Sequence, residues 1–299
     1  MYKSKVVIGT WPLSGDLGNV DKKNVYKILE YCVQVGFTEF DTAPNYGGNF
    51  MESCLGEIFG GNNDIRINTK CGSSAGNQKD FSNIALKKSL DNSLKRLRRN
   101  SIHILFLHNP RKELPDFSPA INFFNSEKNN GRILNGGLSA AKGYKYHLSE
   151  YKQLDVLQDD VNLLFLDGLL NYKDKNNSFY ARSPLATGIL SGKMTNKTVF
   201  GSNDYRMNWL KGKRLKSILK RVNVIENLSG IHLPSLARRF VLQLSNVDKV
   251  IFGLKRLQHV DELVKDINAP LLDEKLVKQL IRLQKEDFGL HVKEKKLGY

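Results

Sequence analysis

The chain has 299 residues, of which 40% are hydrophobic and 25% are charged, so it can bury a sizeable core and is not globally disordered. Its formal net charge of +16 permits a nucleic acid, an anionic membrane or a phosphorylated ligand as partner. The three cysteines, Cys32, Cys54 and Cys71, are widely spaced and form no CxxC pair, which argues against a disulfide framework and a zinc site, so we expect no metal.

Short apolar runs alternate with longer amphipathic segments along the whole chain. The runs predict eight strands, over Val6–Gly9, Glu39–Asp41, Arg66–Lys70, Ile102–His108, Ile133–Leu138, Asp155–Gln158, Phe179–Arg182 and Val250–Gly253. Helical spacing of apolar residues predicts helices over Asn24–Val35, Phe50–Phe59, Ser82–Arg98, Ser118–Asn129, Tyr144–Tyr151, Leu215–Leu228, Ser235–Leu244, Leu257–Asp266 and Asp273–Gln284.

Eight strands with helices between them favour a closed barrel over an open doubly wound sheet, which usually has fewer strands. The glycine fingerprint GxGxxG that follows the first strand of many open sheets is absent from the sequence. We therefore predict an α/β protein, a (β/α)8 TIM barrel, in a single domain over residues 1–299.

The basic residues are spread along the chain rather than gathered in one tract. Their densest clusters, Lys87–Arg99 and Lys211–Arg221, lie on predicted helices, so solvated outer faces explain them better than a nucleic-acid surface. No stretch approaches the roughly 18 apolar residues that span a bilayer, and the start of the chain is too polar for a secretory signal. We expect a cytoplasmic monomer or weak oligomer without nucleic-acid or membrane partners.

The segment between Gly192 and Lys213 is long and polar for a connection in a barrel. Loops of this length are usually functional or mobile. It follows the seventh predicted strand, where barrel enzymes commonly bind phosphate groups. A cover over a dinucleotide and a mobile surface excursion are both compatible with its basic character.

Ionisable side chains stand at or just beyond the ends of three predicted strands. Asp41 ends the second strand and Tyr46 follows it, Lys70 ends the third and His108 ends the fourth. Because the carboxyl ends of barrel strands converge on one mouth, these four side chains are expected to meet there. Each alone has an ordinary explanation, such as a cap, a packed ring or a turn, and only the combination predicts a catalytic site.

The chemistry of the four groups suggests how they would act together. A phenol has a pKa near 10, so Tyr46 needs a nearby cation to stabilise its phenolate, and Lys70 can be that cation. Asp41 would keep a buried Lys70 charged, and His108 could bind a carbonyl oxygen or relay a proton. Together they would polarise a C=O group and deliver a proton to its oxygen.

Motifs spread over essentially the whole chain carry a family resemblance. They are FDTAPNYG (Phe40–Gly47), ESCLGEIF (Glu52–Phe59), TKCG (Thr69–Gly72), Ser89–Pro110 ending in LFLHNP, GGLS (Gly136–Ser139), VLQDDVNLL (Val156–Leu164), SPLATGILSGK (Ser183–Lys193) and VIFGLKR (Val250–Arg256). In order and at this spacing the sequence resembles the aldo-keto reductase family of nicotinamide-dependent TIM-barrel oxidoreductases.

The resemblance implies an enzyme that transfers hydride between NADPH, with NADH as the other candidate, and an aldehyde, ketone or sugar. It implies Asp41, Tyr46, Lys70 and His108 as the catalytic tetrad, with Tyr46 as general acid in reduction. It further implies cofactor contacts from Ser139 and Gln158 to the carboxamide, Ser183 and Leu185 to the pyrophosphate, and Gly253, Lys255 and Arg256 near the adenosine 2′-phosphate. The cationic pair at the last position favours NADPH.

Three positions depart from the family pattern. Ala140 replaces a common Asn beside the carboxamide, and Leu263 replaces an Asn that often contacts adenine. Arg182 replaces an aromatic residue that stacks on the nicotinamide; its planar guanidinium can also stack, but it would repel the oxidised, cationic ring. We therefore expect the reduced cofactor to bind in preference to the oxidised one.

The leading hypothesis is thus an active carbonyl reductase. A cofactor-binding regulatory or scaffold protein with little turnover is the alternative, to which Ala140 and Arg182 lend weight. A basic nucleic-acid binder is a third, resting on net charge alone. The sequence does not specify the carbonyl substrate, although a basic mouth would suit a phosphorylated or nucleotide-linked sugar.

Overall fold

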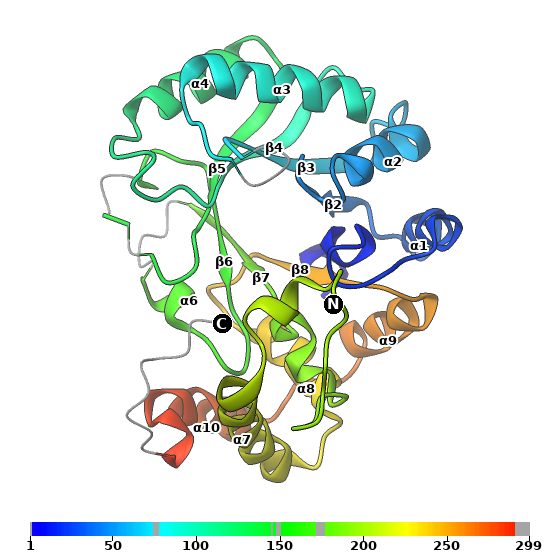
Figure 1. Ribbon diagram of the computed structural model, residues 1–299, viewed down its shortest axis with the longest axis vertical. Coiled ribbons are helices and arrows are strands. Elements are labelled where there is room, and N and C mark those ends of the chain that lie inside the picture. The colour runs from blue at the N-terminus through cyan, green and yellow to red at the C-terminus, as the bar shows by residue number, and fades with distance from the viewer. Residues whose placement is uncertain (1, 74–77, 145, 148–150, 172–176, 291–299) are drawn as a thin grey trace.

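The computed structural model describes residues 2–73, 78–144, 146–147, 151–171 and 177–290. Within them eight parallel strands pair in chain order, and the first also pairs with the eighth, which closes a barrel (Figure 1). The strands are β1 (Val6–Gly9), β2 (Glu39–Asp41), β3 (Arg66–Cys71), β4 (Ile102–His108), β5 (Ile133–Ser139), β6 (Val156–Asp160), β7 (Ser178–Arg182) and β8 (Lys249–Gly253). The predicted (β/α)8 barrel is confirmed.

Helices surround the strands (Figure 1). They are α1 (Lys22–Gln34), α2 (Phe50–Phe59), α3 (Asn83–Leu97), α4 (Ser118–Asn129), α6 (Asp167–Asn171), α7 (Gly212–Ser229), α8 (Leu233–Gln243), α9 (Leu257–Ile267) and α10 (Glu274–Lys285). Local chemistry sets several starts: the side chains of Asp21, Ser82 and Asp273 accept hydrogen bonds from the first turns of α1, α3 and α10.

Most predicted boundaries agree with the structure within two or three residues. The short helix α6 has no counterpart among the predictions, and β6 runs to Asp160 where we expected an end at Gln158. The two extra residues are aspartates, which are rare in strands, but Asp160 lies in register with Arg182 of β7 and pairs with it. The helix expected over Tyr144–Tyr151 includes residues 145 and 148–150, which lie outside the described residues.

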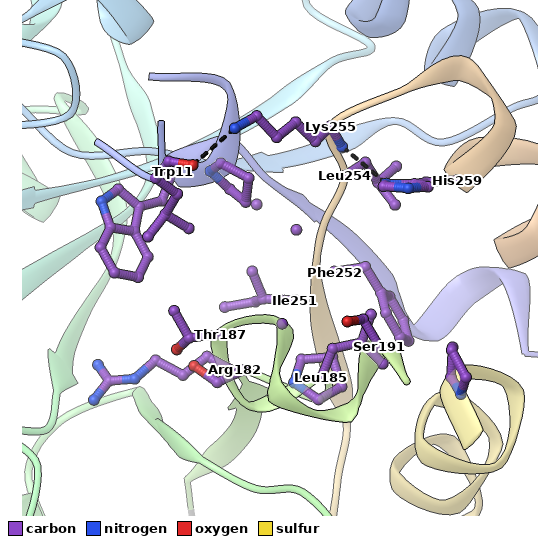
Figure 2. Close-up of a pocket in the computed structure, with 18 of the residues that line it drawn as sticks. Trp11, Arg182, Leu185, Thr187, Ser191, Ile251, Phe252, Leu254, Lys255 and His259 are labelled. Atoms are coloured by element: carbon purple, nitrogen blue, oxygen red, sulfur yellow. Dashed lines mark hydrogen bonds between the residues drawn. The ribbon is translucent and has the colours of Figure 1, made fainter. Parts of the chain in front are cut away.

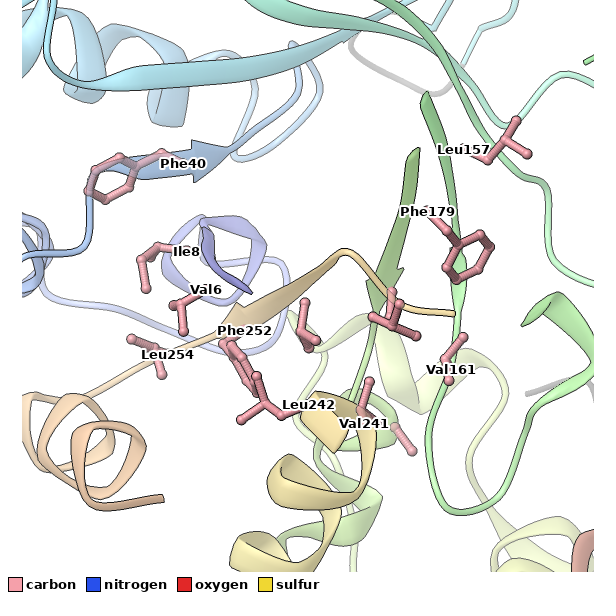
Figure 3. Close-up of a cluster of buried hydrophobic side chains, with 14 of the residues drawn as sticks. Val6, Ile8, Phe40, Leu157, Val161, Phe179, Val241, Leu242, Phe252 and Leu254 are labelled. Atoms are coloured by element: carbon pink, nitrogen blue, oxygen red, sulfur yellow. The ribbon is translucent and has the colours of Figure 1, made fainter. Parts of the chain in front are cut away.

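Alternation along the strands separates two apolar layers. Val7, Ile104, Phe106, Val156, Tyr180 and Ile251 fill the barrel interior. Other strand residues, such as Val6, Ile8, Phe40 and Phe252, belong to the main core outside the barrel, which also includes residues of α8 (Figure 3). Because Phe40 and Leu107 face outward, the next residues, Asp41 and His108, face inward at the carboxyl end of the barrel.

Candidate active site

A buried ion pair joins the ends of β2 and β3. The Lys70 ammonium lies 2.6 Å from Asp41 Oδ1 and also donates to the Thr42 carbonyl at 2.8 Å. Burial alone lowers the pKa of Lys70, but Asp41 and Tyr46 outweigh burial and hold that pKa above its usual value. Lys70 is therefore a fixed cation inside the barrel mouth.

The Tyr46 phenol stands beside this cation. The Lys70 ammonium is 5.0 Å from the centre of the Tyr46 ring, and the indole of Trp11 and the imidazole of His108 each have their ring centres 6.3 Å from it. Burial raises the pKa of Tyr46, and Lys70 and Arg182 offset part of that rise. The phenol is consequently protonated at neutral pH, with a cation in place to stabilise the phenolate.

His108 completes the group at the end of β4. Burial, reinforced by the charges of Lys70, Arg182 and Lys79, lowers the pKa of His108 well below its usual value. Its Nδ1 is buried and has no hydrogen-bond partner among the described residues. A neutral imidazole with an unused ring nitrogen can bind a polar group of a ligand.

A hydrogen-bonded row extends from Asp41 across the mouth to β7. Gln158 Nε2 donates to Asp41 Oδ2 at 2.9 Å, and the Ser139 hydroxyl donates to Gln158 Oε1 at 2.8 Å. Arg182 Nη1 in turn donates to Ser139 Oγ at 2.7 Å. The ends of β2, β5, β6 and β7 are thereby joined through side chains.

Two aspartates of β6 hold the Arg182 guanidinium in place. Its Nε donates to Asp160 Oδ1 at 2.9 Å, and Asp159 lies 3.8 Å from Nη2. Burial lowers the pKa of Arg182, but the negative charge of Asp160 outweighs burial and raises that pKa. In return, the positive charges of Arg182 and Lys142 outweigh the burial of Asp160 and hold its pKa well below the usual range. Burial instead raises the pKa of Asp159 to about 6.

A channel of about 510 Å³ is lined by Tyr46 and by residues at the ends of β7 and β8. Figure 2 shows part of its wall, with Arg182 and Leu185 on one side and Lys255 and His259 on another. This volume lies within the range typical of pockets for cofactors and drug-sized ligands. Its walls include nine of the predicted residues, namely Asp41, Tyr46, Gln158, Arg182, Ser183, Leu185, Gly253, Lys255 and, at the far end, Arg256. Lys70, His108 and Ser139 lie buried behind the wall.

The segment after β7 forms one wall of the channel in a strained conformation. Ser183, Ala186 and Thr187 all have positive φ angles, between 49° and 57°, which non-glycine residues rarely adopt. Such strain persists only where surrounding structure enforces it and is concentrated at functional sites. Here it turns the backbone beside the predicted pyrophosphate position.

The far end of the channel is basic. Arg256 is exposed and immediately precedes α9, whose first turn contains no acidic residue. Lys255 extends over the channel edge and donates to the carbonyls of Leu17 at 2.8 Å and Gly18 at 3.1 Å (Figure 2). The Lys255 backbone N–H donates to His259 Nδ1 at 3.3 Å, which brings a histidine that sequence reasoning missed into the wall.

The long segment after Gly192 folds back over this region. Asp204 forms an isolated antiparallel bridge with Leu17, and the Tyr205 N–H donates to the Asp16 carbonyl at 2.9 Å. The segment contributes Lys193, Met194, Thr198, Phe200 and Arg206 to the channel wall. A cover over a bound dinucleotide is one of the two roles left open by the sequence, and this placement supports it.

The structure thus brings the four predicted catalytic residues together and lines one channel with most of the predicted cofactor residues. Sequence reasoning missed Asp160 and Lys142, which surround Arg182, and His259 at the basic end. In the sequence, Asp160 is indicated only by the pair of aspartates, Asp159 and Asp160, that directly follows the predicted sixth strand. Leu263, flagged as a departure, is fully buried and does not line the channel.

Two kinds of site have no support in the described part of the chain. Its helices include none with the length and apolar character needed to cross a membrane. Its His, Cys, Asp and Glu side chains include no group of three or more placed to hold a metal ion.

Comparison with known proteins gives concordant matches over the chain. The model of the Aldo/keto reductase family matches residues 5–284. The chain is 26% identical over 271 residues to the aldo-keto reductase YhdN of Bacillus subtilis, which covers 85% of this chain and 82% of that protein. It is 24% identical to a probable voltage-gated potassium channel subunit beta of Oryza sativa, covering 93% and 92%.

Among solved structures, a glycerol dehydrogenase of Gluconobacter oxydans has the same fold. It superposes with a TM-score of 0.80 at 22% identity and covers 98% of this chain and 95% of that one. At this identity the likeness concerns the barrel itself.

Proposed function

Because the chain belongs to the aldo/keto reductase family, whose members are NAD(P)H-dependent oxidoreductases of carbonyl compounds, we propose that it reduces its substrate with NADPH and that Tyr46 supplies the proton. One observation carries the proposal: the Asp41–Lys70 pair, 2.6 Å apart, holds a cation 5.0 Å from the Tyr46 ring centre at the inner end of the channel.

Tyr46 acts as general acid in this scheme. When bound, the nicotinamide cofactor supplies the hydride that is added to the carbonyl carbon. Tyr46 donates its phenolic proton to the carbonyl oxygen, and Lys70 stabilises the phenolate that remains. Asp41 keeps Lys70 charged although the ammonium is buried.

His108 orients the substrate. Its lowered pKa keeps the imidazole neutral at physiological pH, so one ring nitrogen can donate a hydrogen bond to the carbonyl oxygen while the other carries no proton. This hydrogen bond would hold the oxygen near the Tyr46 hydroxyl, since the two rings meet edge to face with centres 6.3 Å apart.

The residues that would hold the cofactor follow the channel outward from Tyr46. In the proposed arrangement they are Ser139, Gln158 and Arg182 around the nicotinamide, Ser183 and Leu185 along the pyrophosphate, and Gly253, Lys255 and Arg256 near the adenosine. The channel's volume, its strained wall after β7 and its basic far end fit a dinucleotide.

We favour NADPH over NADH because of the charges at the far end. Arg256 is exposed on the channel wall, and the first turn of α9, which contains no acidic residue, adds its positive dipole end. The ammonium of Lys255 already binds the Leu17 and Gly18 carbonyls, so Arg256 is the better candidate for a phosphomonoester.

Arg182 should make the site discriminate between redox states of the cofactor. Its guanidinium lines the channel near Tyr46 and is held by Asp160, so it cannot move far from a cationic ring. NADPH should therefore bind more tightly than the oxidised form, and in Arg182→Leu that preference should shrink. Titrations that give equal affinities for both forms in the unaltered protein would contradict this assignment.

The substrate is proposed to be a small carbonyl compound, with sugars and phosphorylated sugars as candidates. Trp11 stands beside Tyr46 and offers an aromatic face, while Arg182 and Lys142 contribute positive charge near the mouth. Asp160 offsets part of that charge. A panel of simple aldehydes, keto-sugars and sugar phosphates, each with NADPH and with NADH, tests both substrate class and cofactor choice through absorbance at the nicotinamide band.

The second candidate function is a cofactor-binding subunit with little turnover. The similarity to a plant protein named as a probable channel subunit beta favours it. Protein that binds NADPH with quenching of its intrinsic fluorescence but oxidises none of it across the panel would support this candidate and contradict the reductase. Turnover that depends on Tyr46 would do the reverse.

A further inference from the structure

Arg182 is tied to the catalytic ion pair through a continuous row of side chains. The row runs from the guanidinium to Ser139 at 2.7 Å, from Ser139 to Gln158 at 2.8 Å and from Gln158 to Asp41 at 2.9 Å. It ends on Lys70, 2.6 Å from the other carboxylate oxygen of Asp41. Ser139, Gln158 and Asp41 are all at least 96% shielded from solvent.

The two ends of the row determine its direction. A guanidinium can only donate, so Ser139 Oγ must accept from Arg182. An ionised carboxylate can only accept, so the amide nitrogen of Gln158, rather than its oxygen, must face Asp41. The Gln158 oxygen then faces Ser139, whose single proton has to point toward it.

Arg182 is itself anchored on both sides. Its Nε donates to Asp160 at 2.9 Å and its Nη2 donates to the Ala140 carbonyl at 2.7 Å, so one planar group joins β7 to β6 and to the end of β5. A lysine at position 182 would retain the charge but could not present three directed donors in one plane. The position therefore uses the shape of the guanidinium as well as its charge.

We propose that Arg182 is a positioning residue that acts through Ser139 to fix the amide of Gln158, with its nitrogen toward Asp41 and its remaining donor and acceptor toward the channel. The unused Nε2 hydrogen and Oε1 lone pair of Gln158 would then match the acceptor and donor of a primary carboxamide. The inference rests on the proposed function, because it takes the nicotinamide carboxamide as the group that Gln158 meets.

The test separates this role from simple electrostatics by breaking the row in two ways. Ser139→Ala removes the link but leaves the charge of Arg182, whereas Arg182→Lys keeps a charge but loses the fork. Affinity for NADPH is measured by quenching of intrinsic fluorescence, to which Trp11 in the channel wall contributes. Ser93→Ala is the matched control, because Ser93 is a buried serine that accepts from Arg96 far from the channel, on α3.

Each single substitution should weaken NADPH binding about 10-fold, the usual effect of losing one buried hydrogen bond to a charged group. The double variant should also bind NADPH only about 10-fold more weakly than the unaltered protein, because both changes interrupt the same row. Ser93→Ala should bind NADPH like the unaltered protein. Thermal unfolding of all four variants confirms that folded protein is being compared, and a merely structural role would lower stability without changing the dissociation constant of the folded fraction.

Independent effects, with the double variant about 100-fold weaker, would overturn the inference, as would unchanged affinity in both single variants. Either result leaves the reductase proposal standing when the unaltered protein oxidises NADPH. Failure of the unaltered protein to bind NADPH at all would instead overturn the proposed function, and this inference with it.

Discussion

Replacing Asp41 by asparagine tests the buried ion pair at the centre of the site. The substitution keeps the shape of the side chain but removes the charge 2.6 Å from the Lys70 ammonium. At an effective dielectric constant of about 20, that separation corresponds to about 6 kcal/mol of attraction before desolvation is subtracted. Breaking such a pair from one side typically costs about 3 to 5 kcal/mol, because the remaining charge stays buried, and we expect this loss of unfolding free energy at pH 7.

The pH dependence of the loss identifies its cause. In the unaltered protein the pKa of Lys70 lies above its usual value, so its contribution to stability is fully present below about pH 10.4 and disappears as pH rises through the folded-state pKa. In Asp41→Asn burial is the dominant influence and lowers the pKa of Lys70, so that variant gains stability as pH rises toward about 10. Urea unfolding should show that the difference in unfolding free energy between the two proteins is smaller at pH 9.5 than at pH 7.

Glu274→Gln is the matched control, because Glu274 pairs with Lys278 on the surface, where both side chains are more than three-quarters exposed. It should cost less than about 1 kcal/mol at either pH. A loss below about 1 kcal/mol for Asp41→Asn, or a loss that is the same at both pH values, would refute the role given to the pair.

Three further predictions concern Tyr46 as the general acid, Arg256 at the basic end of the channel, and Asp159. The reduction rate should fall as pH rises through the pKa of Tyr46, which burial raises above its usual value near 10, so a fall in kcat/KM centred near neutral pH would contradict the assignment. Arg256→Gln should weaken NADPH binding about 10-fold and leave NADH binding unchanged. Equal losses of affinity for the two cofactors would contradict the proposal that Arg256 binds the 2′-phosphate. Burial raises the pKa of Asp159 to about 6, so its ionisation reduces stability as pH rises from about 4 to 6. Asp159→Asn should therefore stabilise the protein by about 3 kcal/mol at pH 7 but not at pH 4 in urea unfolding, and equal effects at both pH values would contradict that origin.

The barrel was predictable because its strands are short apolar runs that polar segments separate. Val6–Gly9 and Ile102–His108 have the predicted bounds, and alternation along them places His108 inside the mouth. The meeting of Asp41, Tyr46, Lys70 and His108 at one mouth followed from the convergence of strand ends, whereas their catalytic roles are what the family resemblance implies and stay a proposal. Local sequence and one rule of barrel geometry were sufficient at these positions.

Contacts between distant segments were not predictable in the same way. Lys255 was expected to face a phosphate, but its ammonium binds the carbonyl of Leu17, 238 residues earlier in the chain. For Arg182 the sequence indicated only an approach to the nicotinamide ring, whereas its hydrogen bonds to Asp160, Ser139 and Ala140 depend on the register of β5, β6 and β7. Such partners are set by tertiary placement, about which residue type and spacing carry little information.

Turnover by Tyr46→Phe tests the central claim most directly. The change removes only the phenolic oxygen, and the matched control Tyr205→Phe removes the same atom from a half-exposed tyrosine that packs against Trp11, with ring centres 6.0 Å apart. We expect Tyr46→Phe to bind NADPH normally while its reduction rate falls by about 10²- to 10⁴-fold, the usual contribution of a general acid, and Tyr205→Phe to remain active. Reduction by Tyr46→Phe at the rate of the unaltered protein would contradict the account.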